Sequence, residues 1–101
     1  MDQEPVDLHS LVEEVHDETT FIEFLKALMK DRMDEVRKEA ISPSNPYGPR
    51  ANGWENGSIE QFLDAAATWG EESKDGLIYY TKPENPWRRC AHIIFAGKFY
   101  E

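Results

Sequence analysis

Two histidines near the N-terminus, His9 and His16, flank Glu13 at a spacing that places all three side chains on one face of a helix. Imidazole and carboxylate groups are zinc ligands, and metal sites use steps of this kind. A closed site needs further ligands from another segment, and the sequence offers no second cluster of this type. We therefore expect exposed histidines on an acidic helix, with no metal ion and no cofactor.

The single cysteine, Cys90, stands two residues before His92, a spacing that points the two side chains to different faces of a helix. They cannot act together as a nucleophile and its base. The sequence also lacks a glycine-rich phosphate loop, a nucleophile elbow and a paired-cysteine zinc pattern. Its carboxylates fall almost entirely on polar faces, whereas general acid–base catalysis needs a desolvated one. We therefore expect no catalytic residues and no enzymatic activity.

The N-terminal part of the chain is strongly acidic. Residues 1–25 hold eight of the 20 aspartates and glutamates and no lysine or arginine. Such a surface would attract a basic protein partner and select against other partners. The alternative is a solvated face that only keeps the protein soluble. The candidate partner-binding acids are Glu13, Glu14, Asp17 and Glu18.

Trp54 and Asn56 form a second candidate site, just before the serine that caps a predicted helix. In the structural interpretation, Trp54 folds onto Phe62 or Ile59, and Asn56 closes the turn through backbone hydrogen bonds. In the functional interpretation, the two residues are a recognition pair on a loop. We favour the structural interpretation and keep both residues as candidates for partner binding.

Composition excludes several classes of protein. The 101 residues carry a formal net charge of −9, which weighs against binding to nucleic acid or to an anionic membrane. One cysteine cannot form an intrachain disulfide. The first residues are acidic where a signal peptide would be basic, and no apolar segment approaches the roughly 20 residues of a membrane span. We expect a cytoplasmic protein.

Apolar residues recur at three- and four-residue steps, which predicts an all-α fold, a small bundle in a single domain spanning 1–101. Three firm helices are expected at about 20–39, 58–69 and 86–100, and a weaker N-terminal one at about 6–16. Thr20 and Glu23 would form the capping box of the first, and Gly70 would end the second. The predicted buried face of the helix at 20–39 consists of Phe21, Leu25, Leu28, Met29, Arg32, Met33 and Val36.

The connections are less regular. Residues 42–57 contain three prolines and three glycines, so we expect a long loop that is either functional or partly disordered. Residues 77–81 are rich in strand formers but lack a partner strand, and we expect an extended, partly buried connection. Residues 1–18 form an acidic segment that could be loosely docked on the rest.

The second half of the chain carries a distinctive pattern, which consists of Trp54, Glu55, Asn56, Ile59, Phe62, Leu63, Trp69, Tyr79, Tyr80, Trp87, Ala91, Ile94, Ala96, Tyr100 and Glu101. This pattern resembles that of a small uncharacterised bacterial domain family, and the first half of the chain matches it more loosely. The resemblance covers about two thirds of the chain. Such a family has no established activity, so the resemblance implies no catalytic or ligand residues.

These observations favour a non-catalytic protein–protein interaction module with an acidic docking face. One version is an antitoxin-like or immunity-like protein that covers a basic surface of its partner. The alternative is a small-ligand or enzyme module, with a pocket between the helices starting near Ser58 and Pro86. A third possibility is a homodimer formed through an exposed apolar face of the last helix. The alternative pocket would be lined by Trp54, Trp69, Tyr79, Tyr80 and Trp87.

Overall fold

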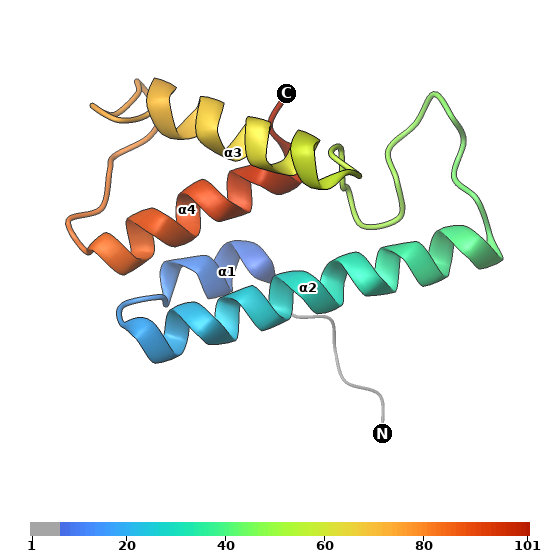
Figure 1. Ribbon diagram of the computed structural model, residues 1–101, viewed down its shortest axis with the longest axis horizontal. Helices are drawn as coiled ribbons and strands as arrows, with labels where there is room; N and C mark the ends of the chain where they lie inside the picture. Colours follow the sequence, from blue (N-terminus) through green and yellow to red (C-terminus); the bar gives the residue numbers. More distant parts are fainter. Residues whose placement is uncertain (1–6) are drawn as a thin grey trace.

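The computed structural model describes residues 7–101 and confirms the all-α bundle (Figure 1). Within these residues there is no strand, and the only bridge pairs Leu77 with Tyr80. The four helices are α1 (Leu8–Glu13), α2 (Glu18–Ile41), α3 (Ile59–Glu72) and α4 (Pro86–Phe99).

The helices form three layers, and α4 is the middle one. One outer layer is the hairpin of α1 and α2, and the other is α3, which packs on the opposite side of α4 (Figure 1). The C-terminal part of α2 extends beyond α1, and the long loop after it leads back toward α3. The buried core lies where α1, α2 and α4 meet, and it consists of Leu8, Val12, Val15, Phe24, Leu28, Trp54, Ala91 and Phe95.

Small residues let α3 and α4 pack closely. Ala65 and Ala66 of α3 are buried, and the ring of Phe62 lies against Gly97 of α4. A Cβ atom at Gly97 would be only 2.7 Å from the Phe62 ring, so this approach requires glycine.

The ends of α2 and α3 differ from those predicted. Asp17 is the N-cap of α2 and forms a reciprocal capping box with Thr20, so the predicted box of Thr20 with Glu23 is wrong. Aspartate is a strong N-cap, and it begins the helix before Thr20 can do so. Helix α3 continues through Gly70 to Glu72, and Ser73 is its C-cap, so the prediction that Gly70 ends this helix is wrong. Gly70 does not take the positive φ that such an end requires.

Helix α1 is shorter than predicted but is firmly packed. Asp7 caps it, and it ends before Glu14 instead of reaching residue 16. Leu8, Val12 and Val15 are all at most 5% exposed, so the chain is not loosely docked from Leu8 onward. The beginning of the predicted segment, residues 1–6, lies outside the described residues.

Candidate functional site

Trp54 is held in the core by a buried carboxylate. Glu35 is completely buried, and its Oε1 accepts hydrogen bonds from the backbone N–H groups of Asn52 and Trp54, each at 3.1 Å. Its Oε2 lies 2.7 Å from the Arg32 guanidinium. The Trp54 ring stacks on Phe62 at 6.1 Å between centroids, which agrees with the structural interpretation of this tryptophan.

Asn56 also has structural contacts. Its Nδ2 donates to the backbone oxygens of Gly97 and Tyr100, at 3.0 and 2.9 Å, and ties the loop to the end of α4. The Trp54 indole N–H donates to Asp31, whose carboxylate also binds Lys98 at 2.7 Å. The side chains of both candidate residues are therefore engaged within the chain.

The four candidate acids lie around the turn between α1 and α2, and two of them have partners. Asp17 caps α2, and the hydrogen bonds from Thr20 hold the pKa of its carboxyl below the usual range. Glu13 binds His92 of α4, a contact between residues far apart in the sequence. Glu14 and Glu18 are exposed and make no side-chain hydrogen bond within residues 7–101.

Glu13 belongs to a chain of polar groups that joins α1, α4 and the connection before α4. His92 Nε2 lies 2.7 Å from Glu13 Oε2, and His92 Nδ1 lies 2.8 Å from the Tyr80 hydroxyl. The Arg89 guanidinium, which can only donate, reaches the same hydroxyl at 3.3 Å. Both ring nitrogens of His92 are therefore engaged, one with the Tyr80 hydroxyl and the other with the Glu13 carboxylate.

A hollow of about 270 Å³ opens beside this chain, between α1, α3 and α4. It differs from the predicted aromatic pocket, of which only Trp69 and Tyr80 contribute to it. Trp87 packs on Phe21 instead, and Tyr79 is 99% exposed. The lining consists of His9, Val12, Glu13, Trp69, Tyr80, His92, Phe95, Ala96 and Phe99.

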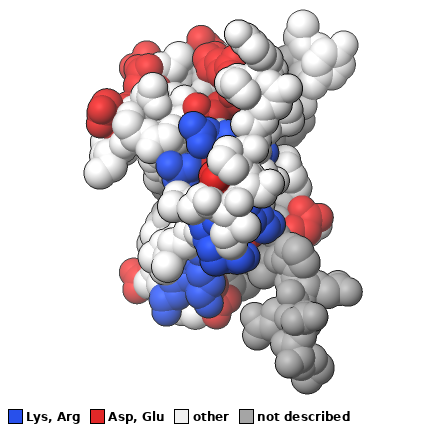
Figure 2. Space-filling model, turned by 90° about the vertical axis from the view of Figure 1, so that its right-hand side faces the viewer, with Lys and Arg blue, Asp and Glu red and all other residues white. Residues whose placement is uncertain are grey.

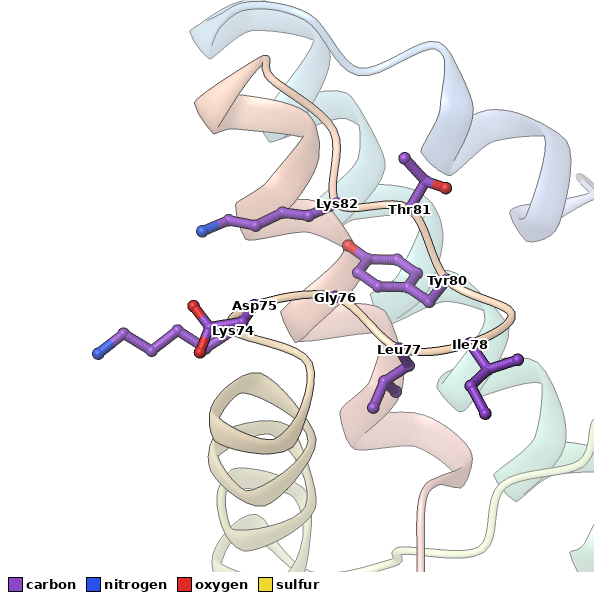
Figure 3. Close-up of a pocket in the computed structure, with 8 residues that line it drawn as sticks. All are labelled: Lys74, Asp75, Gly76, Leu77, Ile78, Tyr80, Thr81 and Lys82. Atoms are coloured by element: carbon purple, nitrogen blue, oxygen red, sulfur yellow. The ribbon is translucent and has the colours of Figure 1, made fainter.

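The turn between α3 and α4 forms a second, wider depression of about 690 Å³ (Figure 3). Lys74 and Lys82 extend to one side of it, whereas Ile78 points away from them (Figure 3). Ile78 is 91% exposed, so the prediction of a partly buried connection is wrong at the tip of the turn and holds only for Tyr80. A tight turn has too few neighbours to bury its tip, and this open depression gathers no convergent polar groups.

The histidines near the N-terminus do not come together. The His9 ring packs on Phe95 at 4.9 Å between centroids, Glu13 binds His92, and the His16 ring contacts the Glu14 carbonyl. Residues 7–101 contain no group of three or more side chains that could hold a metal ion. None of the helices in this part of the chain is both long enough and apolar enough to cross a membrane.

Helix α2 has two apolar faces, and the structure buries only one of them. Phe24, Leu28 and Glu35 point into the protein and are at most 5% exposed. The predicted buried face is therefore partly wrong, because much of it is open to solvent. We call this open face the α2 stripe; its residues and exposed fractions are Ile22 (42%), Leu25 (38%), Met29 (53%), Met33 (62%) and Val36 (52%).

Basic side chains gather at the C-terminal end of α2, although the chain as a whole is acidic (Figure 2). The bases of α2 and α4 at this end are neutralised locally. Arg37 and Lys38 both bind Asp34, at 2.6 and 2.8 Å, and Lys98 binds Asp31. Glu14 and Glu18, the two candidate acids without an ion pair among residues 7–101, lie at the opposite, N-terminal end of α2.

Comparison with known proteins identifies the family but no activity. The model of DUF7660, a family of unknown function, matches residues 17–101. The chain belongs to this family. The match includes α2, α3 and α4, whereas α1 lies before its first residue. Searches of curated proteins and of solved structures found no match.

Proposed function

We propose that this DUF7660 member is a non-catalytic protein–protein interaction module that docks through the α2 stripe. The supporting observation is that five large apolar side chains are exposed along one face of a single helix. Soluble proteins rarely expose contiguous apolar patches of this kind unless a partner covers them. The stripe lies within the residues that the family model matches.

The chemistry of the stripe defines the partner it fits. Positions at steps of three and four residues are those with which an amphipathic helix enters an apolar groove or packs on another helix. Met29 and Met33 are flexible and adapt to differently shaped surfaces. Glu14 and Glu18 at the N-terminal end favour a basic group on the partner, as an antitoxin-like or immunity-like protein would require.

Site-specific photocrosslinking in the native cell tests this proposal. A benzophenone amino acid at Met33 should give a discrete protein adduct, because this side chain is exposed in the α2 stripe. The matched control is the same group at Glu71, which is exposed near the end of α3, away from the α2 stripe. Equal adducts at both positions, or none at Met33, would contradict docking through the stripe.

The exposed thiol of Cys90 bears on where the protein works. Free thiols persist in reducing compartments and are prone to oxidation outside them. We therefore propose that the protein is cytoplasmic. Fractionation of the native cell with the full-length protein tests this, and recovery outside the cytosolic fraction would contradict it.

A second candidate function follows from the hollow beside Glu13. Its walls include Trp69, Tyr80 and Phe95, and its polar side carries a carboxylate whose position His92 fixes. Aromatic faces together with a carboxylate attract a small organic ammonium group. We propose this ligand class as the alternative to a purely protein-binding role.

Choline and its neutral carbon analogue, which has the same shape without the charge, distinguish this alternative. Choline should shift the indole resonance of Trp69, with the neutral analogue bound roughly tenfold more weakly. Glu13→Gln should weaken choline binding, whereas Glu14→Gln on the adjacent residue should not. Equal binding of the two probes, or no shift with choline, would exclude an ammonium site.

A further inference from the structure

We infer that the α2 stripe is covered by the α2 stripe of a second copy of this chain, with the two helices antiparallel about a twofold axis at Met29. This inference rests on the proposed function, because it names the partner of the same face. The stripe covers Ile22 to Val36, which corresponds to about four turns and roughly 21 Å of helix.

The spacing of the stripe is symmetric about its centre. Leu25 and Met33 are each four residues from Met29, and Ile22 and Val36 are each seven residues from it. All five positions fall within an arc of about 80° on the helix. Antiparallel pairing about Met29 therefore places Ile22 beside Val36 of the second copy and Leu25 beside its Met33. A twofold interface requires such self-complementarity.

The charges beside the stripe also match in this arrangement. Glu23 lies six residues before the axis, and Arg37 lies eight residues after it on the same flank. Antiparallel pairing offsets Glu23 from Arg37 of the second copy by only about 3 Å along the axis. Lys26 and Asp34 are related in the same way. Asp34 and Arg37 already bind each other within the helix, at 2.6 Å, so each contact with the second copy would extend an existing ion pair. Each opposite-charge pair occurs twice in a twofold dimer, and the antiparallel helix dipoles add to the attraction.

One pair of like charges opposes the association. Lys30 lies one residue from the axis on the same flank, so it faces Lys30 of the second copy. The two ammonium groups lie near each other, at an exposed position where salt screens their repulsion. Lys30→Ser should therefore tighten the dimer roughly two- to tenfold.

Cysteine crosslinking tests the position of the axis. In a Cys90→Ser background, Met29→Cys places two thiols next to each other across the axis, and mild oxidation should give a disulfide-linked dimer. Ile41→Cys is the matched control, because it is 74% exposed on the same helix. Its two copies would be about 36 Å apart in the antiparallel dimer. Crosslinking at Ile41 as fast as at Met29 would overturn the antiparallel arrangement.

Charge reversal gives an independent test of register. Glu23→Arg or Arg37→Glu alone should raise the dimer dissociation constant roughly two- to tenfold in sedimentation experiments. The double variant should restore dimerisation, because the pair is recreated with opposite polarity. Weakening that the double variant does not reverse would overturn the proposed register.

The same experiments separate this inference from the proposed function. A wild-type protein that sediments as a monomer at millimolar concentration overturns self-pairing. Crosslinks from Met33 to a different protein would then leave docking through the stripe in place. A monomer that also gives no adduct at Met33 overturns both. Dimers with crosslinks at Met29 and not at Ile41 support both.

Discussion

At the scale of single residues, Glu35 attaches the long loop to α2. Its completely buried carboxylate accepts hydrogen bonds from two backbone N–H groups of the loop and pairs with the partly exposed guanidinium of Arg32. A buried carboxylate of this kind is stabilising only while all of its partners are present.

Glu35→Gln should therefore lower the free energy of unfolding by roughly 3 kcal/mol, because the amide keeps only one acceptor oxygen and forms no ion pair with the guanidinium. Urea denaturation measures the change. Glu60→Gln on the exposed side of α3 is the control and should change stability by less than about 0.5 kcal/mol. Similar small effects for both variants would mean that the buried pair contributes nothing.

Trp54 makes the largest apolar contact of the loop, and its ring is only 6% exposed. Trp54→Ala should lower the free energy of unfolding by roughly 3 kcal/mol, because the stacking on Phe62 and the hydrogen bond to Asp31 are lost together. Denaturant titration measures this. A loss well below 1 kcal/mol would return Trp54 to the functional interpretation.

At the scale of elements, two glycines in helices have opposite expected effects. Gly97→Ala places a methyl group 2.7 Å from the Phe62 ring, so it should separate α3 from α4 and cost about 1–3 kcal/mol. Gly70→Ala meets Ile93 at an ordinary 3.6 Å and should stabilise α3 by about 0.5–1 kcal/mol. Thermal unfolding of both variants checks the signs, and destabilisation by both would contradict the contact geometry.

The start of the loop depends on pH through Glu39. Hydrogen bonds from Ser44, and then from the Ala51 N–H, lower the pKa of Glu39 from 4.5 to about 2. Because the pKa is lower in the folded protein, the ionised Glu39 stabilises the folded loop at pH values above 4.5. That contribution is lost as the pH falls from 4.5 toward 2. The amide resonances of Ser44 and Ala51 should move over this range, and Glu39→Gln should abolish the movement.

At the scale of the whole molecule, the α2 stripe is expected to serve association and not folding. Met29→Gln with Met33→Gln should leave the unfolding free energy of the monomer within about 0.5 kcal/mol, because both side chains are exposed. Leu28→Ala on the buried face should cost about 2–5 kcal/mol. Urea denaturation at low protein concentration compares the unfolding free energies of these variants. A large loss of unfolding free energy in the double variant would mean that the stripe contributes to folding.

The sequence by itself determined the helical elements and their approximate bounds. Apolar periodicity and a local cap such as Ser58 act within a few residues, so their effects can be read without a fold. The match with a family of unknown function agrees with the resemblance seen in the second half of the chain.

Only the tertiary structure decided which face of α2 is buried. Helix α2 carries apolar side chains on two faces, and the positions of α1 and α4 decide which of the two faces is buried. Burial of Glu35 and the contact of Glu13 with His92 depend in the same way on segments distant in the sequence. A charge is buried only when such segments supply its partners, and periodicity along a single helix carries no information about them.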